Sequence, residues 1–188
     1  VNAAKMAHGL GAKTIIIGRN LNELRKIDDV FNGQVITLAS TPHNIEQAVV
    51  QSDLVIGGVA ITGAAAPKLV TREMIRKMRP GSVLVDVSID QGGSFETSKP
   101  TSHANPVYVE EGVIHYCVTN MPGAVPNTST HALTNATLQY AVKIANMGLV
   151  AAAKKDAALA KGINTYKGKL TNQPVAEALK MKYEPLQM

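Results

Sequence analysis

The stretches DLVIGGVA (residues 53–60) and GSVLVDVSI (residues 81–89) decide the fold class of this chain. Both are short runs of aliphatic and β-branched residues, typical of strands that are covered on both faces of a parallel sheet. The segment between them contains REMIRKM (residues 72–78), which predicts a helix. A strand, a crossover helix and a second strand make a βαβ unit, so the two strands are expected to lie parallel in one sheet.

The same alternation precedes these stretches. We expect helices over residues 1–10, from after Asn20 to about Phe31, and over residues 43–51, and strands over residues 13–18 and 34–39. Asn20, with Glu23 three residues later, resembles a capping box at the start of the second helix. The alternation predicts an α/β, doubly wound, Rossmann-like parallel sheet, in which ligands bind beyond the carboxyl ends of the strands.

The pattern changes in the second half of the chain. Residues 107–119 predict two short strands joined at Glu111 and Gly112. From Thr130 to about Lys155, an alanine-rich stretch without proline predicts one long helix. Shorter elements are expected over residues 156–162, 166–170 and 175–180. The C-terminal segment is therefore expected to be mainly helical.

The first residues predict an incomplete nucleotide-binding unit. Such a unit normally opens with a strand and a glycine fingerprint, and the helix follows them. Here VNAAKMAHGL (residues 1–10) predicts the helix, with neither the strand nor the fingerprint before it. We therefore expect a sheet that lacks its first strand, with an exposed apolar groove in that strand's place unless another chain fills it.

Composition excludes several classes of function. Of 188 residues, 45% are hydrophobic and 18% charged, which is typical of a packed globular protein. The formal net charge is +5, but Lys and Arg form no run of four or more and no aromatic residues interleave with them, so we expect no nucleic-acid partner. No stretch approaches the roughly 18 apolar residues of a membrane span, and no signal peptide is visible. We expect a cytoplasmic protein without a membrane partner.

Cysteine and histidine do not indicate a metal site. Cys117 is the one cysteine and lies in an apolar run, so it is expected to be a buried small side chain rather than a nucleophile. The five histidines show no metal-ligand spacing and have no second cysteine to join them. We predict no metal.

Three longer strings resemble the alanine dehydrogenase family: VNAAKMAHGLGA, LVIGGVAITGAAAPKLVTREMIRKMRPGSVLVDVSIDQGGSFETSKPT and GVIHYCVTNMPGAVPNTSTHALTNATLQYA. The resemblance covers nearly the whole chain. It implies a dinucleotide-binding domain inserted into a substrate domain. Residues 1–125 would be the dinucleotide-binding domain, incomplete at its N-terminus. Residues 126–188 would be a long helix and a return segment to a substrate domain that is absent here.

The resemblance also implies an activity and an assembly. The activity is reversible oxidative deamination of L-alanine to pyruvate and ammonia, with hydride transfer to NAD(P), in amino-acid catabolism. The full-length protein would be a homohexamer, and this chain alone is expected to be inactive. Two alternatives remain: the NAD(P)-binding domain of a proton-translocating transhydrogenase, or a non-catalytic cofactor-binding fragment. Turnover of alanine discriminates between the enzyme and the fragment.

Asp90 is the candidate catalytic residue. It is expected at the end of the strand VLVDVSI, with Gly92 and Gly93 after it to allow a tight turn. An ionised carboxylate there would stabilise an iminium and could orient or deprotonate a water molecule. The aspartate of the family's IDQGG motif matches this residue. The alternative is an aspartate that only caps the turn, and Asp86 in the same strand is expected to be structural.

Other residues match positions that contact the cofactor in the family. Ser40 matches the adenosine side, Val59 and Ala60 follow the third strand, and Val87 is expected beside the nicotinamide. Val118, Asn120 and Met121 match the segment that holds the carboxamide and ribose. For Val59 and Val87, plain core packing is the alternative.

Gly18 and Arg19 depart from the family's pattern. An enzyme that uses NAD normally carries a carboxylate at the end of the second strand for the ribose hydroxyls. Here Gly18 takes that position and Arg19 follows it. The missing carboxylate removes repulsion of a 2′-phosphate, and a guanidinium can bind one. We therefore expect NADP to be favoured over NAD; the alternative is an Arg19 that points to solvent.

Overall fold

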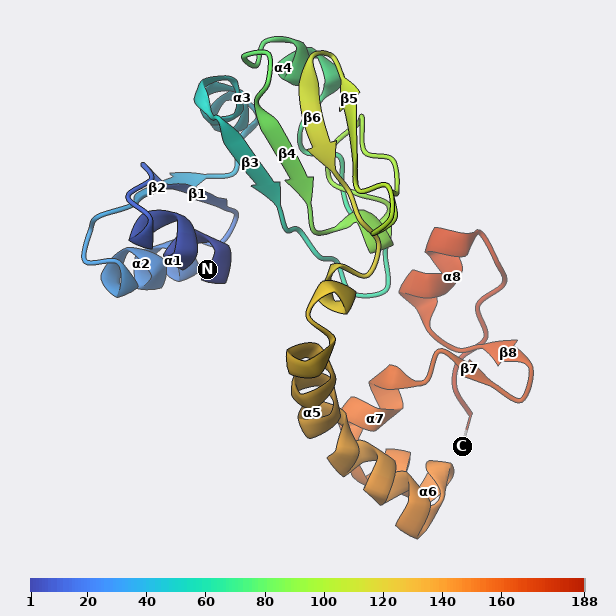
Figure 1. Ribbon diagram of the computed structural model, residues 1–188. Helices are drawn as coiled ribbons and strands as arrows, with labels where there is room; N and C mark the ends of the chain where they lie inside the picture. The colour runs from blue at the N-terminus through green and yellow to red at the C-terminus, as the bar shows by residue number, and fades with distance from the viewer. Residues whose placement is uncertain (188) are drawn as a thin grey trace.

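The computed structural model describes residues 1–187 and shows alternating helices and strands, followed by a mainly helical part (Figure 1). The α-helices are α1 (Asn2–Gly9), α2 (Leu21–Val30), α3 (Pro42–Gln51), α4 (Arg72–Arg76), α5 (Pro126–Met147), α6 (Leu149–Lys155), α7 (Ala157–Gly162) and α8 (Gln173–Leu179). The strands are β1 (Ile15–Gly18), β2 (Ile36–Ala39), β3 (Leu54–Gly57), β4 (Val83–Asp86), β5 (Val107–Glu110), β6 (Val113–Tyr116), β7 (Thr165–Tyr166) and β8 (Lys169–Leu170). Two 3-10 turns complete the described elements: η1 (Ile89–Gln91) and η2 (Met121–Ala124).

The strands form two parallel groups. β1 pairs with β2, whereas β3, β4 and β6 pair in that order, and β5 closes the second group as an antiparallel strand. This confirms the predicted α/β class with a mostly parallel sheet. In a doubly wound sheet, strands numbered along the chain lie side by side in the order 3-2-1-4-5-6. β2 corresponds to strand 3 of this order and β1 to strand 2. β3, β4 and β6 correspond to strands 4, 5 and 6. No described strand corresponds to strand 1, which would lie between β1 and β3.

The edge of β3 exposes apolar side chains, as expected for a strand without a neighbour on that side. Leu54 is 49% exposed and Ile56 is 42% exposed. Ile17 of β1, by contrast, packs against the main core. In Figure 1 the unit of α1, β1, α2 and β2 lies to one side of the second sheet.

The main core lies between the second sheet and the helices α3 and α4. Nine buried side chains form it: Ile45, Val49, Val70, Met74, Ile75, Met78, Leu84, Phe95 and Val113. Leu84, Ile75 and Val113 are fully buried, and burial of each such side chain stabilises the fold by about 1.5–3 kcal/mol. The core therefore fixes β4, whose carboxyl end leads into the candidate site.

Polar caps start several helices where the sequence predicts them. The side chain of Asn20 accepts hydrogen bonds from the backbone N–H groups of Asn22 and Glu23, at 3.0 and 3.3 Å. The Glu23 carboxylate turns outward and binds Lys26 at 2.7 Å, so it differs from the reciprocal contact of a capping box. The side chains of Thr41 and Thr71 start α3 and α4 in the same way as Asn20 starts α2.

The expected single helix of residues 130–155 is two helices, so that prediction was wrong. α5 begins earlier, at Pro126, and α5 and α6 are separated by Gly148. Gly148 has φ 74° and ψ 156°, a conformation that is essentially restricted to glycine. Because the alanine-rich composition favours helix on both sides of Gly148, the sequence does not indicate that the helix ends there. Within residues 1–187, no helix is long and apolar enough to cross a membrane.

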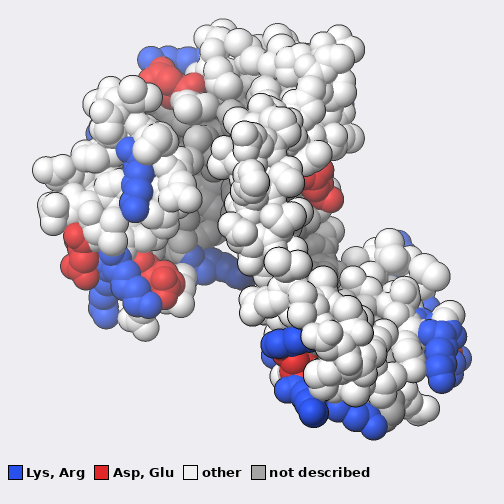
Figure 2. All heavy atoms as spheres, turned by 60° about the horizontal axis from the view of Figure 1, so that its bottom comes forward, with Lys and Arg blue, Asp and Glu red and all other residues white. Residues whose placement is uncertain are grey.

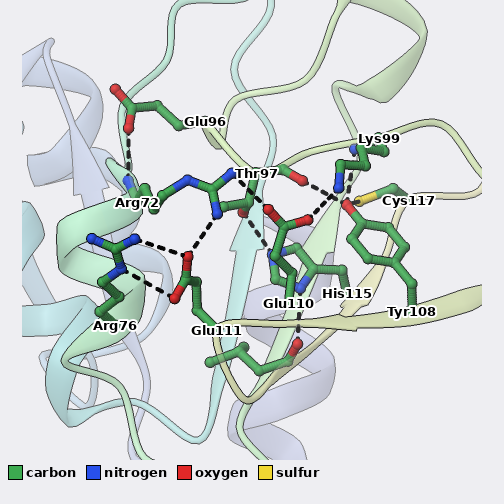
Figure 3. Close-up of polar contacts among 11 residues, drawn as sticks. Arg72, Arg76, Glu96, Thr97, Lys99, Tyr108, Glu110, Glu111, His115 and Cys117 are labelled. Carbon is green, nitrogen blue, oxygen red and sulfur yellow. Dashed lines mark hydrogen bonds and ion pairs between the residues drawn. The ribbon is translucent and has the colours of Figure 1, made fainter.

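The hairpin of β5 and β6 turns at Glu111 and Gly112, as predicted, with φ 53° and 75° at these residues. Both glutamates at the tip bind basic side chains (Figure 3). Glu111 contacts Arg72 at 2.7 Å and Arg76 at 3.1 Å. Glu110 contacts Arg72 at 2.6 Å and Lys99 at 2.5 Å. The hydrogen bond from Lys99 is the main reason that the pKa of Glu110 is lowered, and the bond from Arg76 has the same effect on the pKa of Glu111.

His115 lies fully buried beside this hairpin. Its Nδ1 donates to the carbonyl of Val113 at 2.9 Å, so Nε2 accepts from the hydroxyl of Thr97 at 2.7 Å. The imidazole stacks on Tyr108 with ring centroids 4.8 Å apart. Burial lowers the pKa of His115, which keeps the ring neutral. Cys117 is also buried, and burial raises the pKa of its thiol, so it is an inert core residue as expected.

A pair of adjacent glycines tests how tightly β3 packs. A Cβ at Gly57 would lie 2.1 Å from Oγ of Ser94 and 2.8 Å from Cζ of Phe95, whereas a Cβ at Gly58 has open space. We expect Gly57→Ala to destabilise the fold by about 1–3 kcal/mol and Gly58→Ala to leave its free energy of unfolding nearly unchanged. Urea unfolding measures both. Equal effects of the two variants would show that the contact of β3 with Ser94 and Phe95 is not tight.

The buried histidine predicts a dependence of stability on pH. The pKa of His115 is lower in the folded protein than its ordinary value of 6.5, so the unfolded chain takes up a proton first as the pH falls. We expect the free energy of unfolding to decrease as the pH falls through 6.5 toward the lowered value. Unfolding at pH 5 to 8 should show this slope in the parent and in His43→Gln, a control on an exposed histidine. His115→Gln should lose it; an unchanged slope would contradict the assignment.

Candidate functional site

The carboxyl end of β4 is organised by Asp86. Its side chain is fully buried and accepts from the N–H groups of Ser88 at 3.0 Å, Ser94 at 2.7 Å and Phe95 at 3.4 Å. It also accepts from the hydroxyls of Ser94 at 3.2 Å and Ser98 at 2.5 Å. These neutral donors replace the water that a carboxylate loses on burial. Asp86 therefore holds both ends of the loop that contains Asp90, which confirms a structural role.

Two glycines shape this loop. Gly92 and Gly93 have φ 92° and 78°, a region that favours glycine. A Cβ at Gly93 would lie 2.8 Å from Oδ2 of Asp86 and 2.7 Å from Cβ of Ser98. Position 93 therefore requires a glycine, both because of its positive φ and because the carboxylate of Asp86 lies so close. The tight turn that the sequence predicts after Asp90 is confirmed.

Asp90 does not end a strand, so the expected strand over residues 81–89 is corrected. β4 ends at Asp86, and Asp90 lies in the following 3-10 turn η1. The side chain of Asp90 is exposed. Both of its oxygens accept from the backbone N–H of Asn120, each at 3.2 Å. The turn thus presents an accessible carboxylate at the carboxyl end of the sheet and connects it to the segment after β6.

That segment contains the other predicted residues of this region. Asn120 is the N-cap of η2, with φ 50° and ψ 51°, and Met121 begins the turn. Val118 is fully buried, so it lies beneath the surface that a ligand would reach. The hydroxyl of Ser129 donates to the carbonyl of Pro122 at 2.8 Å, which holds η2 against the start of α5.

Val59, Ala60 and Val87 lie close to the same turn. The hydroxyl of Ser88 donates to the carbonyl of Val59 at 2.7 Å, and the N–H of Val87 donates to the carbonyl of Gly57 at 2.8 Å. The side chain of Val87 is 52% exposed, which argues against plain core packing at this position. Ala60 is exposed and Val59 is half-buried.

Gly18, Arg19 and Ser40 form a second group, at the carboxyl ends of β1 and β2. The N–H of Ser40 donates to the carbonyl of Gly18 at 2.9 Å. Arg19 is exposed and directly precedes Asn20, the cap of α2. The first turn of a helix attracts anions through its free N–H groups and its dipole. A Cβ at Gly18 would lie 3.1 Å from Cδ2 of Leu24, so a larger side chain would have to displace that methyl group.

Sequence reasoning missed a loop that supports the turn of Asp90. The N–H of Ala66 donates to the carbonyl of Gln91 at 2.8 Å, and Nζ of Lys68 donates to the carbonyl of Gly92 at 2.6 Å. Gly63 of this loop also approaches α8, because a Cβ there would lie 3.0 Å from Cβ of Pro174. A lysine within the loop AAAPKLV was the available signal, but only tertiary structure shows which carbonyl it binds.

The exposed charges and the hairpin network are separate from this region. The N–H of Gly81, which precedes β4, donates to the carbonyl of Gly112 at 2.9 Å. The ion pairs of Glu111 with Arg72 and Arg76 in Figure 3 therefore lie at the amino end of the sheet. On the face that Figure 2 shows, Lys and Arg form small separate groups with acidic side chains among them. This distribution is unlike the continuous basic surface of a nucleic-acid-binding protein.

What the site can do follows from its two groups of residues. One group offers an accessible carboxylate, an exposed apolar side chain and the αL residue Asn120, which suits a planar organic ring beside a centre that develops positive charge. The other offers a guanidinium beside a helix N-terminus, which suits phosphate. Within residues 1–187, no three His, Cys, Asp or Glu side chains come together as a metal site.

Comparisons with known proteins show the family of this chain. The sequence model of the family "Alanine dehydrogenase/PNT, C-terminal domain" matches residues 1–173. The chain is 55% identical to the alanine dehydrogenase of Halomonas elongata over 182 residues, which are 97% of this chain and 49% of that protein. Alanine dehydrogenase 2 of Staphylococcus aureus (strain USA300) is also 55% identical, over 99% of this chain and 50% of the relative. The chain thus spans about half the length of the curated relatives it matches.

Solved structures show the same relationship. A structure of L-alanine dehydrogenase superposes with a TM-score of 0.82 at 48% identity, covering 95% of this chain and 49% of that chain. Transhydrogenase from Sinorhizobium meliloti superposes with a TM-score of 0.54 at 23% identity, over 86% of this chain and 49% of that chain, which shows a shared fold alone. The family match and the 55% identity extend over nearly the whole chain, so the chain belongs to the alanine dehydrogenase/PNT C-terminal domain family.

Proposed function

We propose that this chain is the dinucleotide-binding half of an enzyme that reversibly deaminates L-alanine to pyruvate and ammonia. The observation that carries the proposal is the exposed carboxylate of Asp90, held at the carboxyl end of the sheet by the amide of Asn120. The 55% identity to alanine dehydrogenases over 97% of the chain supports the same activity. The distant transhydrogenase is the weaker alternative, at 23% identity.

The chemistry requires a group that manages positive charge. A bound nicotinamide cofactor would accept the hydride from Cα of alanine, and the substrate then becomes an iminium. Asp90 is negatively charged when ionised and accessible, so it would stabilise this cation. It would also orient the water that adds to the iminium carbon and accept a proton from it. Loss of ammonia from the resulting carbinolamine gives pyruvate.

The described residues fit a dinucleotide. We assign the nicotinamide and its ribose to the group of Val87, Asp90, Asn120 and Met121, because Val87 offers an exposed apolar side chain in the same loop as the carboxylate. Val118, which we assign to the same group, is fully buried and would support the segment of Asn120. Val59 and Ala60 lie between this group and the adenosine side in chain order. We assign the adenosine to Gly18, Arg19 and Ser40, because the N–H of Ser40 donates to the carbonyl of Gly18 and brings the ends of β1 and β2 together.

Gly18 and Arg19 favour NADP over NAD in this proposal. Gly18 brings no carboxylate that would repel a 2′-phosphate, and Arg19 is exposed next to the first turn of α2. Helix N-terminus and guanidinium then act on the same anion. The alternative is an Arg19 that stays in solvent while NAD is retained.

We further propose the organisation of the complete protein. Residues 1–125 form the dinucleotide-binding domain, and residues 126–188 lead back to a substrate domain that binds the carboxylate of alanine. The exposed apolar residues of α5, among them Leu133 at 65% and Leu138 at 61%, offer surface for that domain or for other subunits of a homohexamer. With alanine as the substrate, the protein would act in amino-acid catabolism, for which we propose the cytoplasm as the location.

Asp90→Asn tests the chemical role. The amide keeps the shape and can still accept from the N–H of Asn120, but it cannot balance a positive charge or take a proton. We expect kcat for alanine in the full-length protein to fall by about 10²- to 10⁴-fold, with little change in the Kd of the dinucleotide. Asp53→Asn is the matched control, because Asp53 is exposed and precedes β3 at the other end of the sheet. Near-normal kcat in Asp90→Asn would reduce Asp90 to a structural residue.

Arg19→Gln tests the cofactor preference. A charge-assisted bond contributes about 1.5–3 kcal/mol, so we expect kcat/KM for NADP to fall roughly 10- to 150-fold while that for NAD changes little. The loss should diminish with added salt, because screening acts within about 10 Å at 0.1 M.

Arg25→Gln is the control for Arg19→Gln, because Arg25 is exposed on α2, the helix that follows Arg19, and donates to Asn22. Gly18→Asp combined with Arg19→Ile should move the preference further toward NAD. A parent that already prefers NAD tenfold, or an unchanged ratio in the double variant, contradicts the NADP assignment.

A further inference from the structure

His103 is brought to the candidate site by a short parallel bridge. Thr101 pairs with Val118, through the N–H of Thr101 donating to the carbonyl of Cys117 at 2.9 Å and the N–H of Thr119 donating to the carbonyl of Thr101 at 3.1 Å. The loop after Thr101 thereby runs alongside the segment that leaves β6. His103, two residues beyond the bridge, faces Asn120, two residues beyond Val118.

The imidazole of His103 makes one specific contact there. Its Nε2 lies 3.1 Å from the carbonyl oxygen of Asn120, and because a carbonyl only accepts, Nε2 is the donor. Gly123 lies beside this contact. A Cβ there would be at an ordinary contact distance of 3.4 Å from Nε2 of His103 and tight against Nδ2 of Asn120, at 3.1 Å. The same carbonyl also accepts from the N–H of Gly123 at 2.8 Å.

Asn120 is bound at both ends of its backbone. Its N–H donates to the Asp90 carboxylate, and its carbonyl accepts from His103. Between these bonds the residue has φ 50°, a left-handed conformation that costs a non-glycine residue free energy and persists only where its surroundings hold it. Without His103 the carbonyl keeps only the bond from the N–H of Gly123. Loss of one of its two donors would loosen the backbone of Asn120 and weaken the alignment of its N–H with Asp90.

We infer that His103 is a positioning residue: it holds Asn120 in the left-handed conformation that directs the backbone N–H toward Asp90. His103 does not touch the reacting atoms, and it acts through one residue on the carboxylate. The inference rests on the proposed role of Asp90, but the geometry of Asn120 can be measured without any turnover.

Two substitutions separate positioning from a merely structural role. His103→Ala removes the donor, whereas His103→Gln can place an amide N–H close to the position of Nε2. We expect His103→Ala to lower kcat for alanine roughly 2- to 12-fold, the effect of one neutral hydrogen bond, without a change in the melting temperature. His103→Gln should restore most of the loss. His43→Ala is the control, because His43 is exposed on α3.

The backbone amide resonance of Asn120 gives a second, independent measurement. It should shift in His103→Ala and return toward the parent position in His103→Gln. An unchanged kcat in His103→Ala, or equal losses in both variants with a lower melting temperature, overturns the inference. If the parent protein does not deaminate alanine at all, the proposed function fails. The Asn120 resonance then still tests His103. A resonance that does not move in His103→Ala overturns its role, and a shift in His103→Ala that is reversed in His103→Gln supports it.

Discussion

The buried carboxylate of Asp86 is the constraint on which the candidate site depends. A carboxylate without water around it requires hydrogen-bond donors, and here they come from both ends of one loop, at Ser88 and at Ser94 to Ser98. No cation from the described residues contacts it, so each donor is a neutral group fixed by the chain itself. The loop cannot change shape without leaving an oxygen unsatisfied. Because η1 lies inside this loop, the position of Asp90 is fixed by a residue that substrate never needs to touch.

Sequence alone predicted the parts of the fold that depend on local pattern. The alternation of strand and helix, the cap at Asn20 and the turn at Glu111 and Gly112 all follow from periodicity and from residue-specific backbone preferences. The break at Gly148 was missed because its neighbours favour helix equally on both sides. The end of β4 was placed too late because VSI continues the apolar run of VLVD. The carboxylate of Asp86 accepts from the nearby N–H of Ser88 and from Ser94 and Ser98 farther along the chain, and the strand ends there.

The candidate site shows the same division. Motif positions predicted roles for Asp90, Asn120 and the group of Gly18, Arg19 and Ser40, and these roles stay predictions. The partners that hold them were not visible, because Lys68, Ser88 and His103 act on backbone carbonyls that are distant in sequence. Every residue type has a backbone carbonyl, so a hydrogen bond to a carbonyl does not restrict which residue accepts it. The accepting residue therefore cannot be recognised from the sequence.

The contact of Gly63 with Pro174 gives the C-terminal part a second attachment. The chain leaves the carboxyl end of the sheet through η2 and α5, a helix of 22 residues, and returns through α8 to the loop that supports Asp90 (Figure 1). At a rise of about 1.5 Å per residue, α5 extends roughly 33 Å. The C-terminal part is thus attached to the carboxyl end of the sheet at two points, η2 and the contact of Gly63 with Pro174. If it moves as a rigid body, rotation about the line through these two points is its easiest motion. Its far end at α6 would then move by about 6 Å for a turn of roughly 10° across that length, while both attachments stay in place.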